Sequence, residues 1–169
     1  MKEELQTESG KVTVRTIRAE DDIEMGRIIR SCFIDYDAKQ EGTVYSDTVV
    51  DHLFEAFQHN RSRYFILEKD GLMLGGAGIS ALKEADPGVC ELQKMYIRKE
   101  GRGKGLGSLL LSYCLAFAKE QGFHTCYLES LPELRDALRM YEKAGFKYIP
   151  ARMGNTGYFG CSLYMKLEI

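Results

Sequence analysis

A run of glycines lies directly before an apolar pattern that is typical of a helix. The run reads IRKEGRGKGLGS over residues 97–108, with Gly101, Gly103, Gly105 and Gly107 at alternate positions and Arg102 and Lys104 between them. The first N–H groups of a helix lack partners and carry a partial positive charge, so a backbone without Cβ atoms can bind an anion there. A tight strand-to-helix connection explains one or two of these glycines. Four glycines with two cations favour an anion site.

The two common nucleotide motifs do not account for this run. A P-loop requires Gly-Lys followed by Ser or Thr, but Gly103-Lys104 is followed by Gly105. A dinucleotide fingerprint has the spacing GxGxxG after the first strand of its unit, whereas the spacing here is GxGxGxG. The run therefore predicts an anion site of another kind.

A metal site is a weaker possibility elsewhere in the chain. His52, Glu55 and His59 have the spacing i, i+3 and i+7, which could place three zinc ligands on one side of a helix. Leu53 and Phe57 define the buried face of the same segment, so the three polar residues are more consistent with a solvated surface. We predict no metal site.

The elements that must position the glycine run follow from the apolar patterns. Strands are expected at 11–18, 90–97, 124–130, 146–150 and 161–169, with a hairpin over 63–80 that turns at Asp70-Gly71. Helices are expected from Asp21 or Asp22, over 49–57, from about 105 to 122, and after a Ser130–Glu133 capping box up to 145. The strands at 90–97 and 124–130 are joined through a helix, so they are expected to be parallel. This order is that of a mixed α/β fold.

The overall composition excludes several classes of protein. The 169 residues fit one domain, expected over 11–169, and the polar residues 1–10 are expected to be disordered. A net charge of −2 and a pI near 6.0 argue against nucleic-acid or membrane-surface binding, and no apolar run is long enough to span a membrane. Five scattered cysteines are typical of free thiols in the cytoplasm.

Two motifs make the sequence similar to a known family. The pattern Arg102-x-x-Gly105-x-Gly107, between ELQKMYI (91–97) and a helix, resembles the Q/R-x-x-G-x-G/A acetyl-CoA motif of the GNAT N-acetyltransferase superfamily. LRMYEKAGFKYI (138–149) resembles the closing helix and strand of that family, often written Y-x-x-x-G-F. The opening VRTIRAEDD (14–22) is similar in style. The resemblance covers nearly the whole domain.

The resemblance implies a fold and a cosubstrate. The expected fold is a single-domain α/β GNAT-like fold, with a mixed central sheet of about six to seven strands, a splayed parallel pair and about four flanking helices. Acetyl-CoA would lie between strands 91–97 and 125–129. Its pyrophosphate would rest on the amides of Arg102, Gly103, Lys104, Gly105, Leu106, Gly107 and Ser108. Met95 and Ile97 would contribute main-chain groups.

The resemblance also suggests catalytic residues. Tyr141 matches a tyrosine that protonates the CoA thiolate in many relatives, although its place beside Leu138 also fits a core residue. Glu91 matches the position of a general-base glutamate in some relatives. The alternative is that Glu91 has no catalytic role and is only a solvent-exposed glutamate at the end of a strand. Glu129 is a weaker candidate for the same role. Leu134 departs from the family, because many relatives carry an asparagine there that contacts CoA.

The acceptor follows less directly from the sequence. In the family, the acceptor pocket is made by the loop between the first two helices, here DYDAKQEGTVYSD (35–47), and by the last hairpin, here MGNTGYFG (153–160). Acidic and aromatic residues suit a cationic amine, and bare glycine amides suit a carboxylate. We expect an N-acetyltransferase that acts on a small-molecule amine, with a homodimer plausible on family grounds. A peptide or protein acceptor and a non-catalytic acyl-CoA-binding module are the alternatives.

Overall fold

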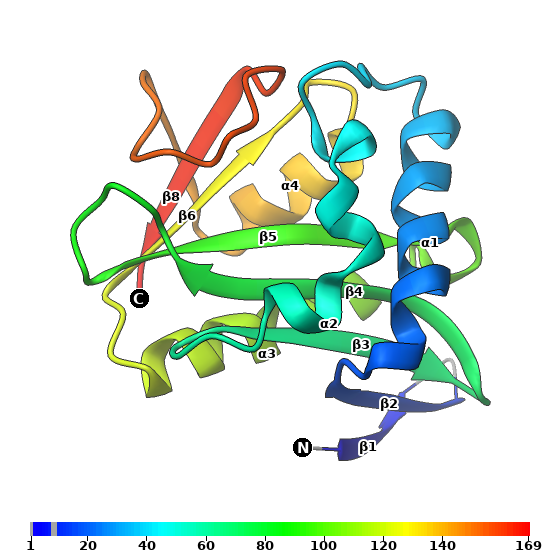
Figure 1. The fold of residues 1–169 in the computed structure, drawn as a ribbon. Helices are drawn as coiled ribbons and strands as arrows, with labels where there is room; N and C mark the ends of the chain where they lie inside the picture. The colour runs from blue at the N-terminus through cyan, green and yellow to red at the C-terminus, as the bar shows by residue number, and fades with distance from the viewer. Residues whose placement is uncertain (1, 8–9) are drawn as a thin grey trace.

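The computed structural model describes residues 2–7 and 10–169, and the strands in these residues form one sheet (Figure 1). The order across the sheet is β1-β2-β3-β4-β5-β6-β8-β7. Adjacent strands are antiparallel except β5 and β6, which are parallel as expected. The strands are β1 (Lys2–Thr7), β2 (Gly10–Thr16), β3 (Arg63–Lys69), β4 (Leu72–Ala81), β5 (Val89–Ile97), β6 (Thr125–Ser130), β7 (Lys147–Ile149) and β8 (Leu163–Glu168).

Four α-helices cover the two faces of this sheet within the described residues, and the expected α/β fold class is confirmed. They are α1 (Asp22–Asp35), α2 (Leu53–Ala56), α3 (Leu106–Glu120) and α4 (Arg135–Lys143). In Figure 1, α1 and α2 lie in front of the sheet and α3 and α4 lie behind it.

Alternation along the strands divides the core into two layers. In β3, Phe65 and Leu67 pack in the cluster that contains the apolar face of α3, whereas Tyr64 and Ile66 pack in the cluster that contains α1. Side chains of a strand point to opposite faces in turn, so a strand buried on both faces needs a continuous apolar run. The five cysteines are buried free thiols, as expected.

Three local predictions were wrong, and each was overridden by hydrogen bonding. Residues 2–7, expected to be disordered, pair with the open edge of β2 and form β1, so the sheet has eight strands in the described residues. The expected helix over 49–57 is divided, because Asp47 caps a 3-10 turn at Thr48–Asp51 and α2 begins only after it. The expected capping box at Ser130 is absent, because Ser130 pairs with β8.

The parallel pair β5 and β6 separates after three paired positions. Their register runs from Val89 opposite Thr125 to Glu91 opposite Tyr127, and the strands then diverge, as Figure 1 shows. Beyond Glu91, β5 continues beside β4 and β6 continues beside β8. The splayed parallel pair expected from the sequence is therefore present, and it opens the sheet in its middle.

A bulge in β5 lies where the strands part. The register with β4 shifts between Gly76 and Gly78, so that β5 contains one extra residue there. Lys94 adopts a left-handed backbone conformation at this point, with φ of 50°. The hydroxyl of Tyr64, whose side chain is fully buried, donates a 2.7 Å hydrogen bond to the Lys94 carbonyl. The Tyr64 hydroxyl thus holds a carbonyl that the bulge has displaced from the ladder.

Tyr64→Phe should destabilise the protein by about 1–3 kcal/mol, because it leaves the buried Lys94 carbonyl without this donor. Urea unfolding measures the change. Tyr148→Phe is the matched control: Tyr148 is half exposed and its hydroxyl bonds Glu142 at the surface, so a change below about 0.5 kcal/mol is expected. Equal effects of the two substitutions would show that the bulge does not depend on Tyr64.

Candidate functional site

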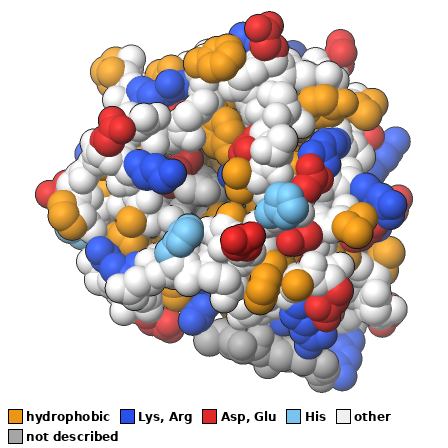
Figure 2. Space-filling model, viewed as in Figure 1, with side chains coloured by type: hydrophobic (Ala, Val, Ile, Leu, Met, Phe, Trp, Pro, Cys, Tyr) orange, Lys and Arg blue, Asp and Glu red, His pale blue; other side chains and the backbone are white. Residues whose placement is uncertain are grey.

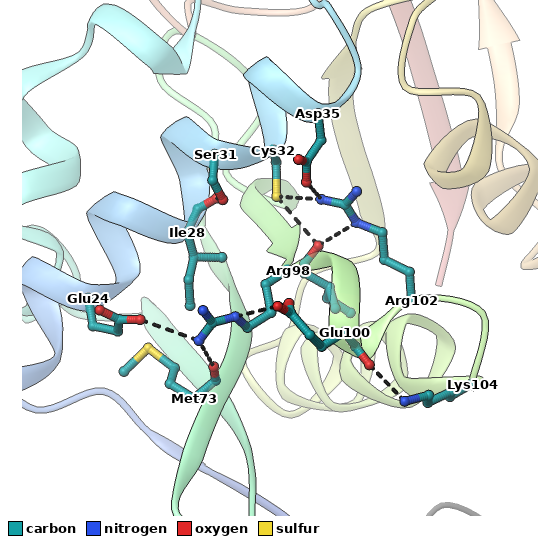
Figure 3. Close-up of polar contacts among 11 residues, drawn as sticks. Glu24, Ile28, Ser31, Cys32, Asp35, Met73, Arg98, Glu100, Arg102 and Lys104 are labelled. Atoms are coloured by element: carbon teal, nitrogen blue, oxygen red, sulfur yellow. Dashed lines mark hydrogen bonds and ion pairs between the residues drawn. The ribbon is translucent and has the colours of Figure 1, made fainter.

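A cavity of about 400 Å³ lies where β5 and β6 diverge, and it extends to the start of α3. Its walls come from α1, β5, the glycine run, β6 and α4. Of the residues predicted from the sequence, the following line it: Glu91, Met95, Ile97, Arg102, Gly103, Gly105, Gly107, Ser108 and Tyr141. The other two do not line it, because Leu106 is buried in the core and the Lys104 ammonium donates to the Glu100 carbonyl outside it (Figure 3).

The glycine run has an open inner side because of its backbone conformation. Gly103 and Gly105 have φ of 72° and 73°, the left-handed region that costs an L-residue roughly 1–2 kcal/mol. A Cβ atom on either would meet nothing within 4 Å, so this part of the loop is not crowded. Gly105 is the residue before α3, and the N–H groups of the first turn of a helix have no partner within it. The run thus presents backbone donors at the rim of the cavity.

Gly107 is explained by packing instead. A Cβ there would lie 2.9 Å from the sulfur of Met140, so glycine lets α3 approach α4 closely. The alternate glycines therefore serve two purposes, and only some of them are needed for an anion site.

Arg102 points toward α1 and not along the glycine run (Figure 3). Its Nε donates to the Ile97 carbonyl at 2.8 Å, and a terminal nitrogen donates to Asp35 Oδ2 at 2.8 Å. The same nitrogen lies 3.1 Å from the Cys32 sulfur, and the guanidinium stacks over Tyr36 at 4.6 Å. The Arg102 charge is thus paired with Asp35, and the arginine ties the end of β5 to the end of α1.

Tyr141 lies on α4 with its side chain largely buried, and it is also part of the cavity wall. Its ring packs against Phe146, with the ring centroids 5.7 Å apart. Burial raises the pKa of the Tyr141 phenol, so the group stays protonated at neutral pH. The two interpretations of Tyr141 are therefore compatible: its ring packs in the core, and the residue also lines the cavity.

Glu91 lies at the last paired position of β5, where the cavity begins. Only 6% of it is exposed, and it accepts a 2.7 Å hydrogen bond from Gln93 Nε2. Burial raises its pKa to about 8, against the opposing effect of the nearby Lys94 cation. A carboxylate with a pKa near neutral pH can exchange protons in the physiological range.

Glu129, the second candidate carboxylate, has a different environment. Arg152 Nε lies 2.9 Å from Glu129 Oε1 and an Arg152 terminal nitrogen donates to Oε2 at 3.1 Å. The Tyr127 hydroxyl donates to Oε1 at 2.9 Å. Both oxygens of Glu129 are therefore engaged, whereas residues 10–169 offer Glu91 no cation within 4.0 Å.

Sequence reasoning missed a buried lysine in the cavity wall. The Lys94 side chain is 4% exposed, and its ammonium donates to the Tyr158 hydroxyl at 2.6 Å. Tyr158 in turn donates to Asp47 Oδ2 at 2.5 Å, and Asp47 Oδ2 lies 3.5 Å from the Lys94 nitrogen. Burial lowers the pKa of Lys94. A lysine inside an apolar strand pattern is the one signal that could have identified this group.

The two loops expected to shape an acceptor pocket meet beside this lysine. Asp47 belongs to the first loop and Tyr158 to the second, so their hydrogen bond joins the loops. The Gly160 N–H also donates to the Gly42 carbonyl at 2.8 Å. The far wall of the cavity is therefore a closed pair of loops.

The metal site, the basic surface and the membrane span that the sequence analysis weighed were each looked for in the described residues. No group of three His, Cys, Asp or Glu side chains in the described ranges could hold a metal ion, and α2 ends before His59. On the face shown in Figure 2, basic and acidic side chains are interspersed. Across residues 2–7 and 10–169, no helix is long and apolar enough to cross a membrane.

A family model and a curated relative both match this chain over most of its length. The model of the Acetyltransferase (GNAT) family matches residues 25–146. Uncharacterized N-acetyltransferase YjgM of Escherichia coli is 33% identical over 157 residues, which are 92% of this chain and 94% of that protein.

Solved structures are similar in fold. An acetyltransferase of the GNAT family from Staphylococcus aureus superposes with a TM-score of 0.83 at 16% identity, over 93% of this chain and 98% of that one. A phosphinothricin acetyltransferase from Sinorhizobium meliloti, in complex with AcCoA, gives a TM-score of 0.75 at 22% identity, over 94% of this chain and 88% of that one.

The raised pKa of Glu91 makes stability depend on pH. The charged form is disfavoured in the fold, so the contribution of Glu91 is full below its ordinary pKa and is lost as the pH rises to about 8. The wild type should therefore lose this contribution between pH 5 and pH 9, whereas Gln at position 91 does not titrate. The difference in unfolding free energy, Glu91→Gln minus wild type, should rise by roughly 2–4 kcal/mol over this range. Glu55→Gln, at an exposed position, should show no such rise. Parallel pH profiles for the wild type and Glu91→Gln would contradict the assignment.

Proposed function

Because this chain belongs to the GNAT acetyltransferase family and is an acyl-CoA-dependent N-acyltransferase, we propose that it moves the acetyl group of acetyl-CoA to a primary amine of a small molecule. Transfer is by direct attack of the amine on the thioester, with Tyr141 as general acid. The observation that carries the proposal is that one cavity joins the open backbone of the glycine run, the splayed edge of β5, Tyr141 and Glu91.

The glycine run and β5 are suited to bind the two parts of acetyl-CoA. The backbone N–H groups at the start of α3 can bind the pyrophosphate, and the left-handed Gly103 and Gly105 leave space for it. Beyond Glu91, β5 is not paired with β6, so the Met95 main chain can bond the amides of the pantetheine arm. The Ile97 carbonyl already accepts from Arg102, which makes Met95 the stronger ligand.

The phenol of Tyr141 is suited to protonate the leaving sulfur. As the amine nitrogen bonds the acetyl carbon, the C–S bond breaks and its electron pair stays on sulfur as a thiolate. A thiolate has a conjugate-acid pKa near 8.5, and a phenol that stays protonated in its buried position can supply the proton. The phenolate then regains a proton from water.

Glu91 is suited to accept the proton that the amine loses. An ammonium group must be deprotonated before its nitrogen can attack, and Glu91 is a cavity carboxylate without an ion-pair partner among the described residues. Its raised pKa makes it a stronger base than an exposed glutamate. Glu129 is unsuited to the role because Arg152 and Tyr127 hold it.

The enclosed acceptor side of the cavity favours a small molecule over a peptide. The loops that contain Asp47 and Tyr158 are bonded to one another beside the cavity, which limits the room for an extended chain on that side. We also propose a cytoplasmic location, from the scattered cysteines, and a homodimer, from the family resemblance alone.

Acetyl-CoA should release free thiol when the protein is given small amines. A thiol-release assay with amino acids, polyamines, aminoglycosides and peptides measures this, and calorimetry with acetyl-CoA measures binding separately. Turnover restricted to peptides would replace the small-molecule acceptor by a peptide. Binding of acetyl-CoA without thiol release from any amine would support a non-catalytic acyl-CoA-binding module instead.

Tyr141→Phe should lower kcat by about 10²- to 10⁴-fold, the range that general acid catalysis supplies, and leave the Kd for acetyl-CoA within about three-fold. The substitution removes one oxygen and keeps the ring that packs on Phe146. Tyr113→Phe, which alters a tyrosine of α3, is a control for loss of a hydroxyl from the fold. Unchanged turnover in Tyr141→Phe would remove Tyr141 from the mechanism.

A further inference from the structure

A carboxyl group and an ammonium group line the cavity without forming an ion pair with each other. Glu91 and Lys94 both belong to β5 and both are buried in its wall. A buried charge is costly unless it is paired: Lys94 has Asp47 as its anion at 3.5 Å, whereas burial favours the uncharged form of Glu91. No ion pair of 4.0 Å or less joins these two in the described part of the chain, although each influences the pKa of the other. Because both side chains line one cavity, a single ligand in it can contact both of them.

The Lys94 ammonium keeps donor capacity for such a ligand. It has three N–H groups, and one of them donates to the Tyr158 hydroxyl. Asp47, its ion-pair partner, is shared with other donors: Oδ1 accepts from the Val49 N–H at 2.9 Å and Oδ2 accepts from Tyr158. Asp47 Oδ2 lies 3.5 Å from the ammonium, beyond a good hydrogen-bond distance. Lys94 is thus held in position from one side.

The backbone also places Lys94 there at a cost. A left-handed conformation is unfavourable for a lysine, and it persists here because the bulge and the Tyr64 hydroxyl fix the chain. The extra residue of the bulge reverses the alternation of β5, so that Leu92 packs in one core layer and Tyr96 in the other. Strain of this kind combined with a buried cation in a cavity wall indicates a functional position.

We propose that the acceptor is a free amino acid, with its carboxylate bound by Lys94 and its amine beside Glu91. This inference rests on the proposed function and names its substrate class. A free amino acid presents a carboxylate to the spare donors of Lys94 and an amine to Glu91, whereas an amine without a carboxylate uses Glu91 alone. The N-terminal residue of a peptide has an amide in place of that carboxylate, so the same wall disfavours peptides. Apolar residues such as Phe33, Val44 and Leu131 border the cavity and suit an apolar side chain.

The test compares each amino acid with its own carboxamide, which keeps the amine and removes the negative charge. Leucine, phenylalanine, methionine and glutamine are each assayed with their amides by thiol release at saturating acetyl-CoA. In the wild type, kcat/KM should be about 10- to 100-fold higher for the acid than for the amide of at least one pair, the range expected for a hydrogen bond to a charged group. Equal values, or higher values for the amides, would overturn the proposal.

Two substitutions separate an anchoring role of Lys94 from a structural one. Lys94→Met should lower kcat/KM for the acid about 10- to 100-fold and leave the amide within about three-fold, with the loss mainly in KM. Lys94→Arg should retain the preference for the acid. Lys119→Met is the matched control, because Lys119 is an exposed lysine that does not line the cavity. An equal loss for acid and amide in Lys94→Met would assign Lys94 a structural role and overturn the proposal.

Failure of this inference can be told apart from failure of the proposed function. Thiol release with other amines but with neither member of any pair would overturn the amino-acid acceptor and leave the acetyltransferase intact. No thiol release with any amine would remove the proposed function, and this inference with it. If Lys94→Met does not fold, the comparison of acids and amides in the wild type decides the question alone.

Discussion

The separation of β5 from β6 after Glu91 is the constraint on which the rest of the structure depends. A parallel pair that stayed in register would bury its backbone groups in the ladder and leave no cavity. The strands part because β5 stays with β4 through a bulge and β6 stays with β8. The Tyr64 hydroxyl supports the bulge from the α1 face, and α3 begins where β5 ends. One backbone irregularity thus creates the space, the free strand edge and the approach to the glycine run.

The charges around this space show a clear division. Arg102 is paired with Asp35 and Arg152 with Glu129, so these four groups fix the walls. In the wall itself, Glu91 accepts from the Gln93 amide, and the Lys94 ammonium contacts the Tyr158 hydroxyl and Asp47. Burial raises the pKa of Glu91 and lowers that of Lys94, which moves both toward the pH range where proton transfer is useful. The three roles that we propose, those of acid, base and ligand-selecting charge, therefore fall on the distinct groups Tyr141, Glu91 and Lys94.

Much of this could be predicted from periodic patterns and spacing, and the rest could not for physical reasons. The hairpin at 63–80 follows from a pattern that one chain segment contains, and the cavity-lining position of Tyr141 follows from the resemblance of residues 138–149 to the GNAT family. The bulge at Lys94 adds one residue to β5 without a sequence pattern that distinguishes it from a regular strand, so the bulge could not be predicted. The helix expected over 49–57 is broken by a cap and by contacts with α1 that no local propensity describes. Arg102 turns toward α1 because it pairs with Asp35, and this partner is too distant in sequence for a local pattern to indicate it.

The central claim is that the backbone from 102 to 108 binds the diphosphate of an acyl-CoA. Amide chemical shifts of the ¹⁵N-labelled protein, followed during titration with CoA and separately with pantetheine, test it most directly. The account predicts that CoA moves the amide signals of Gly103 to Ser108 strongly and that pantetheine, which lacks phosphate, leaves them in place while shifting those of β5. Saturable CoA binding with those loop signals unmoved would contradict it.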